Sequence, residues 1–135
     1  MIQRRIETWI AKFTLGFLVI YIPIETWTSL PYGLLNPFYL VDVVAMVLMA
    51  WGGILSLKLR PSPSPEILCV VYSWATANGW RATFWRVDHI KKGGDLDRGM
   101  TELWGLGIVT SLAIIIFCIL IYLVVNKINR SGNKL

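Results

Sequence analysis

The chain has 135 residues, of which 56% are hydrophobic and only 16% charged, and its mean hydropathy is +0.60. A soluble domain of this length has too little interior to hide so much apolar surface, so the composition excludes an ordinary soluble protein and indicates a membrane protein. The net charge of +5 would also suit nucleic acid. The basic residues flank hydrophobic runs, however, which favours anionic membrane lipids as the partner and argues against nucleic acid.

The first predicted helix covers about residues 6–27 and carries the tetrad IETW at both ends, at residues 6–9 and 24–27. Eighteen residues make five helical turns and a rise of about 27 Å, so the two copies lie on one face, separated by about the thickness of a bilayer core. Tryptophan is enriched at both membrane interfaces, so the repeat marks the two ends of one transmembrane helix. No small-residue cleavage site follows the apolar run, and we expect a retained helix rather than a secretory signal.

Three further apolar runs predict helices at residues 37–57, 65–87 and 101–125, each near or above the roughly 20 residues that a spanning helix needs. Asn36 and Ser64 each stand before a proline, a pair that suits a helix start, so we expect the second and third helices to begin at Pro37 and Pro65. Pro23 is expected to kink the first helix. The predicted fold is an all-α integral membrane protein, a four-transmembrane-helix bundle forming a single membrane domain over residues 1–135.

The distribution of Lys and Arg predicts the orientation. With four spans, one side of the membrane receives the basic residues of the N-terminal segment, of the connection between the second and third helices, and of the tail: Arg4, Arg5, Lys12, Lys58, Arg60, Lys127, Arg130 and Lys134. The positive-inside rule makes this side cytoplasmic, with both termini inside a plasma (inner) membrane. Five basic residues on the outer side oppose this assignment: Arg81, Arg86, Lys91, Lys92 and Arg98. A re-entrant third helix would bring these inside, but it would place the basic tail outside.

The third helix carries a polar and aromatic stripe. Its members follow spacings of four, three, four and three, and are Trp74, Asn78, Arg81, Trp85 and Asp88. Such a mixture is unsuited to lipid, so we expect the stripe to face the bundle interior or a wet cavity. On the second helix, the same spacing places one carboxylate above an adaptable apolar floor, through Asp42, Met46, Met49, Gly53 and Ser56.

Acidic residues of the other helices fall at the outer level, where they are able to pair with the two arginines of the third helix. The predicted substrate-binding cluster therefore consists of Glu25, Asp42, Asn78, Arg81, Trp85, Arg86 and Glu102. A structural reading stands beside it, in which the arginines only lock helices together. In the same reading the methionines pack, His89 is a solvated loop residue, and four tryptophans mark boundaries. Gly52, Gly53, Gly105 and Gly107 then allow close helix approach.

The sequence lacks the motifs of several common kinds of active site. The chain has no glycine-rich phosphate loop, no HExxH and no CxxC pair. One histidine and two separated cysteines, Cys69 and Cys118, make zinc or haem sites unfavourable, and we expect no disulfide because both thiols face a reducing compartment. We predict no cofactor and no metal ion, although coordination by carboxylates alone stays open.

Three functions fit these observations. The favoured one is binding or transport of a small polar or amphipathic solute through the outer cluster, which prefers an oligomer because 135 residues make a small solute path. The alternative is an accessory subunit that docks onto a larger membrane complex. The least favoured is an intramembrane enzyme such as a lipid isomerase, with a buried carboxyl as acid or base.

Overall fold

The computed structural model of the protein describes residues 2–30, 33, 35–58, 65–93 and 96–132. Four helices follow one another in these residues, namely α1 (Ile2–Ser29), α2 (Pro37–Lys58), α3 (Pro65–Lys91) and α4 (Leu96–Gly132). Arg60, Ser64 and Lys134, which contributed to the sequence-based predictions, lie outside the described residues. The predicted all-α four-helix architecture is confirmed.

The two helix starts predicted at prolines are confirmed, since α2 begins at Pro37 and α3 at Pro65. The Asn36 carbonyl accepts the N–H of Leu40 at 3.0 Å, as an N-cap residue does for the first helical turn. The predicted ends of α4, at residues 101 and 125, are wrong, because α4 continues in both directions to Leu96 and Gly132. Hydropathy locates the apolar part of a helix, but it does not show how far the helix continues beyond that part.

Three of the described helices are long and apolar enough to span a membrane, over Gln3–Trp27, Tyr39–Lys58 and Met100–Ser131, so the protein is an integral membrane protein. The helix that is not among them is α3. Its 27 residues are sufficient for a span, but its second half carries Asn78, Arg81, Arg86 and Asp88. The described residues therefore contain three helices that are apolar enough to span a membrane, whereas four transmembrane helices were predicted.

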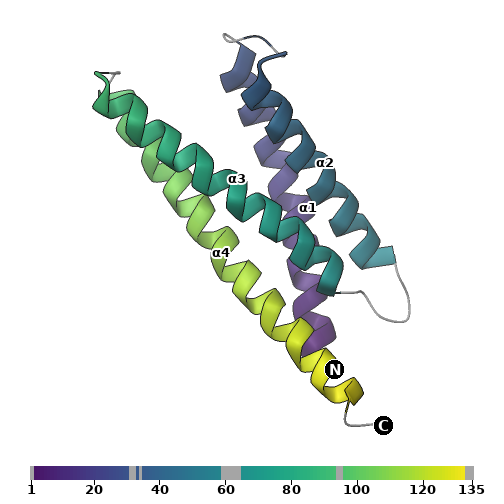
Figure 1. Cartoon of the computed structure of the whole chain (residues 1–135). Coiled ribbons are helices and arrows are strands. Elements are labelled where there is room, and N and C mark those ends of the chain that lie inside the picture. Colours follow the sequence, from purple (N-terminus) through teal and green to yellow (C-terminus); the bar gives the residue numbers. More distant parts are fainter. Residues whose placement is uncertain (1, 31–32, 34, 59–64, 94–95, 133–135) are drawn as a thin grey trace.

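The helices form two antiparallel hairpins, α1 with α2 and α3 with α4 (Figure 1). Contact between the hairpins runs mainly through α2 and α3, while α1 and α4 touch only slightly. We call the end where α1 and α4 respectively begin and finish the terminal end, and the opposite end the loop end. The hairpins converge at the terminal end and diverge toward the loop end (Figure 1).

The repeated tetrad places the same residue types in the same surroundings at both ends of α1. Trp9 and Trp27 are 75% and 76% exposed, while Glu7 is buried and Glu25 half-buried against the other helices. This equivalence follows from the helical register, because residues 18 positions apart point in the same direction. The repeat therefore marks both ends of one helix, with a carboxyl on the inner face of the bundle and an indole outside.

Small residues set the distance between helices at three positions. A methyl group added at Gly52 would lie 2.5 Å from Val71 Cγ2 of α3, and one at Gly53 would lie 2.9 Å from Leu15 of α1. Both residues thus allow close approach, as predicted, and Gly79 does the same beside Thr110 of α4. The prediction is wrong for two glycines of α4, Gly105 and Gly107, since a methyl group at either meets no atom within 4 Å.

The packing methionines were predicted correctly. Met46 and Met49 are buried in a core cluster with Leu18 of α1 and Val71 of α3. A second cluster lies nearer the terminal end and joins α1 to the α3–α4 hairpin, through Ile10, Ala11, Leu68, Tyr72, Ile116 and Leu120. The apolar contact between hairpins is therefore continuous from the terminal end to about mid-bundle.

A buried hydrogen bond between the hydroxyl groups of Thr14 and Tyr72 lies within this core, and its contribution to stability is measurable. Thr14 Oγ1 donates to the Ile10 carbonyl at 2.8 Å, which uses its only hydrogen, so Tyr72 must be the donor in the 2.8 Å contact between the two hydroxyls. We expect Thr14→Val to cost about 1–2 kcal/mol, because it leaves the Tyr72 hydroxyl buried without an acceptor, and Tyr72→Phe to cost less, about 0.5–1 kcal/mol. Unfolding by SDS titration would measure both, and equal costs would contradict this donor assignment.

Candidate functional site

A chain of polar side chains links three helices toward the loop end. Asn78 Nδ2 donates to Asp42 Oδ1 at 2.7 Å, and Arg81 Nη2 donates to Asn78 Oδ1 at 3.0 Å. On the other side, the Glu25 carboxyl of α1 lies beside Asp42. We call these four residues the loop-end cluster.

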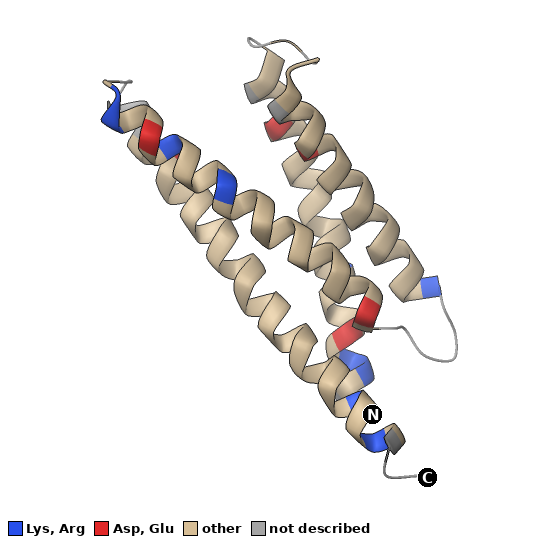
Figure 2. Cartoon of the chain, in the orientation of Figure 1, with Lys and Arg blue, Asp and Glu red and all other residues tan. Residues whose placement is uncertain are grey.

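The register of each helix explains how this cluster assembles. Asn78 and Arg81 are three residues apart, which places them on one face of α3. Asp42 lies on the face of α2 that holds the buried methionines, one turn nearer the loop end. Acidic and basic positions gather toward the two ends of the bundle, as Figure 2 shows. The loop-end cluster therefore joins the two hairpins, through the hydrogen bond between Asn78 of α3 and Asp42 of α2.

Supporting hydrogen bonds hold the α1–α2 side of the cluster. Ser29 Oγ donates to Glu25 Oε1 at 3.4 Å, and the hydroxyls of Thr26 and Tyr39 lie 3.0 Å apart across the hairpin. These hydrogen bonds hold the Glu25 side chain and join α1 to α2 beside the two carboxyl groups of Glu25 and Asp42.

Arg86 and Glu102 form a second, separate group. Their ion pair joins α3 to α4, and the Arg86 guanidinium lies 5.2 Å from the centre of the Trp85 ring, within cation–π distance. Arg86 follows Arg81 by five residues, which turns it about 140° around the helix axis. The single seven-residue cluster predicted from sequence is thus divided, with four residues between α1, α2 and α3 and three residues on the α3–α4 side.

One residue of the α3 stripe faces the bundle interior, and a wet cavity beside the other four stays a prediction. Asn78 is half-buried against α2, but Trp74, Arg81, Trp85 and Asp88 are exposed. The hairpins diverge toward the loop end (Figure 1), so α2 no longer covers the part of α3 that carries Arg81, Trp85 and Asp88. Trp74 lies nearer the terminal end, and the divergence does not explain its exposure. His89, predicted in a loop, lies in the last turns of α3 and stacks on Trp85 at 5.6 Å.

Sequence reasoning missed a polar cluster at the terminal end. Lys127 Nζ of α4 donates to both carboxylate oxygens of Glu66 of α3, at 2.9 and 3.2 Å, although Lys127 was assigned to lipid headgroups. Nearby, Glu7 is 3% exposed, and Gln3 Nε2 donates to the Leu123 carbonyl at 3.2 Å. The repeated tetrad could have indicated Glu7. Glu7 occupies the same position in the first copy as Glu25, a predicted site residue, occupies in the second.

Comparison with other proteins gives no relative to reason from. No family model matches the chain, and no curated protein or solved structure is significantly similar to it. The function must therefore be argued from the site.

The loop-end cluster offers specific chemistry. It combines two neighbouring carboxyl groups, a carboxamide and an exposed guanidinium, which suit a ligand with an anionic group and hydrogen-bonding atoms. Among the described residues, no group of three or more His, Cys, Asp or Glu side chains is placed to hold a metal ion. The described part of the site thus favours recognition by hydrogen bonds and charge.

Proposed function

We propose that the protein binds or transports a small polar or amphipathic solute through the loop-end cluster. In this proposal Arg81 orients an anionic group of the solute. Asp42 and Glu25 exchange or share a proton with it, and Asn78 holds Asp42 and Arg81 in register. The Arg86–Glu102 pair is assigned to helix locking rather than to the solute, which narrows the site predicted from sequence.

The proposal includes a fourth span, α3. This helix packs along α4, its most extensive partner, in antiparallel orientation, so it occupies the same depth as a helix that is apolar enough to span. Its 27 residues extend about 40 Å without interruption, which argues against a re-entrant segment. The described starts and ends of the helices agree with an even number of spans, since α1 begins and α4 ends at the same end (Figure 1).

The orientation follows from charge. The terminal end carries Arg4, Arg5, Lys58, Lys127 and Arg130, so the positive-inside rule places this end in the cytoplasm and the loop end outside. The plasma membrane is the proposed location. The acidic residues of the loop end then balance part of the basic charge at that end. The arginines and lysines on the outer side therefore argue less strongly against this orientation.

The observation that carries the proposal is the exposure of Arg81 at the end of a hydrogen-bonded chain that begins between two other helices. A guanidinium facing lipid is costly, by about 2.5–3.5 kcal/mol even on insertion scales. An exposed Arg81 is therefore best explained by a wet site or a bound ligand where the hairpins diverge.

Native mass spectrometry of the protein in gentle detergent or nanodiscs tests the proposal. We expect wild type to retain a small molecule that Arg81→Ala and Asp42→Asn each lose, with the oligomeric state unchanged. Lys91→Ala is the matched control, because Lys91 is also an exposed cation of α3 and lies outside the cluster. An empty wild type whose variants dissociate or unfold would show that these charges only hold helices together.

A second candidate is an accessory subunit, and the surface of α3 favours it. The least apolar of the four helices also exposes Trp74, Trp80, Phe84 and Trp85, at 43%, 56%, 56% and 47%. Aromatic residues with arginine are enriched in protein interfaces. A polydisperse or unstable protein when purified alone would favour this candidate, whereas a monodisperse one that binds a solute would favour the first.

A further inference from the structure

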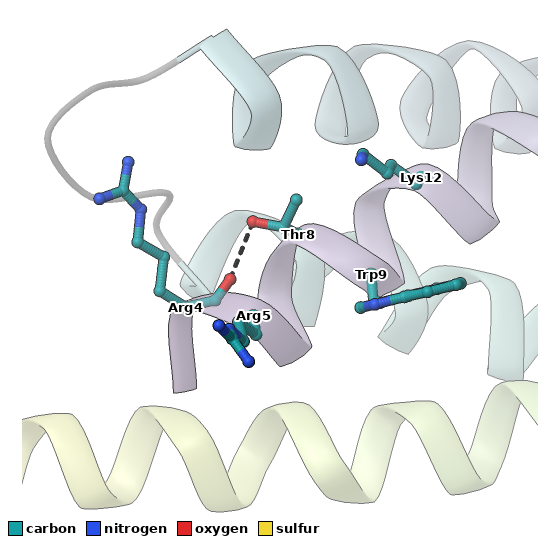
Figure 3. Close-up of a pocket in the computed structure, with 5 residues that line it drawn as sticks. All are labelled: Arg4, Arg5, Thr8, Trp9 and Lys12. Atoms are coloured by element: carbon teal, nitrogen blue, oxygen red, sulfur yellow. Dashed lines mark hydrogen bonds between the residues drawn. The ribbon is translucent and has the colours of Figure 1, made fainter. Parts of the chain in front are cut away.

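A basic hollow lies at the terminal end, away from the loop-end cluster. It has a volume of about 440 Å³, is open to the surroundings, and is lined by five residues of the first turns of α1, namely Arg4, Arg5, Thr8, Trp9 and Lys12 (Figure 3). Residues 4, 8 and 12 follow one line along the helix, and residues 5 and 9 follow the next line. The hollow is thus a feature of one helix face.

The charge of this hollow is not compensated by the described part of the chain. Three of its five lining residues are cationic and none is acidic, and none of the described carboxylates forms an ion pair with them. The nearest acidic residue in sequence, Glu7, is 3% exposed and lies on the opposite side of α1. An anion that pairs with this basic face therefore has to come from outside the described residues.

The donors available in the hollow suit a phosphate. Thr8 Oγ1 already donates its hydrogen to the Arg4 carbonyl at 2.8 Å, so it offers no further donor (Figure 3). The guanidinium groups of Arg4 and Arg5 and the ammonium of Lys12 remain, and these are the groups that pair with phosphate oxygens. Trp9 supplies a flat wall that is 75% exposed, at the depth where indoles meet headgroups.

An apolar track continues from the hollow along the same helix. Trp9, Phe13, Gly16 and Ile20 follow spacings of four, three and four, and all four are exposed. No atom lies within 4 Å of a methyl group added at Gly16, so the track is open there. An acyl chain extending from a headgroup in the hollow would lie along this track, whereas free phosphate would leave the track unused.

We infer that this face of α1 binds an anionic phospholipid, with its headgroup paired to the cations Arg4, Arg5 and Lys12 and one acyl chain along Phe13, Gly16 and Ile20. The long side chain of Lys12 reaches back toward the headgroup level, as lysines near a helix end do. The site is independent of the proposed solute site and requires only that α1 lies in a membrane.

Lipid retention measured by native mass spectrometry tests this inference. The probes are phosphatidylglycerol and phosphatidylcholine with identical acyl chains, titrated into delipidated protein. We expect wild type to retain phosphatidylglycerol at least tenfold better, and the double variant Arg5→Gln/Lys12→Gln to lose this preference. The control Lys91→Gln/Lys92→Gln removes the same charge at the loop end and should keep it.

Three results would overturn the inference. Equal retention of both lipids by wild type would show that the headgroup is not recognised. An equal loss in the control would show that only net charge acts. Inorganic phosphate tested without lipid separates the two sources of this anion: if it displaces phosphatidylglycerol at equal concentration, the hollow is a free-phosphate site and the apolar track contributes nothing.

Discussion

Replacing Arg86 by alanine is expected to lower the free energy of unfolding by about 3–5 kcal/mol, because Glu102 would be left without its main countercharge. The pair is well shielded, with side chains 21% and 30% exposed, and the Arg86 Nε and Glu102 Oε2 atoms are shielded almost completely. The loss should be measured by SDS titration or by thermal unfolding followed through tryptophan fluorescence.

The double variant Arg86→Leu/Glu102→Leu is the control for this expectation. Removing both charges also removes the uncompensated carboxylate, so the double variant should be far more stable than Arg86→Ala, and near wild type. If both variants lose the same amount, packing of Arg86 on Trp85 rather than charge is the source of stability.

The elements of this fold follow closely from the sequence, and particular residues explain why. Pro37 and Pro65 indicated two helix starts correctly, because proline is favoured in the first turn of a helix. The buried methionines of α2 followed from the 3.6-residue period. The ends of α4 did not follow, since polar residues beyond an apolar run do not show whether the helix continues.

The candidate site was predictable in part. The link from Asp42 to Asn78 and Arg81 follows from spacing and from the shared level of the residues in four antiparallel helices. The separation of Arg86 from it depends on rotation around α3, which membrane depth alone does not specify. The divergence of the hairpins depends on which residues meet between α2 and α3, and a single sequence does not reveal that pairing.

The close approach of α2 to α3 depends on Gly52. The substitution Gly52→Ala is expected to lower the free energy of unfolding by about 3 kcal/mol, at the upper end of the range for overpacking. The new methyl group would lie 2.5 Å from Val71 Cγ2 and 3.7 Å from Ile67 Cγ2, and both neighbours are β-branched and therefore stiff. Because α2 and α3 supply most of the contact between the hairpins, the strain must be relieved by moving one hairpin against the other.

Two matched variants make this expectation specific. Gly53→Ala meets the more flexible end of Leu15 within the α1–α2 hairpin and should cost less, and Gly105→Ala meets nothing and should be neutral or stabilising by up to about 1 kcal/mol. SDS titration would rank the three variants. If Gly52→Ala unfolds like Gly105→Ala, then α2 and α3 are not held at this distance, and the bonds from Asp42 to Asn78, rather than apolar packing, would have to join the hairpins.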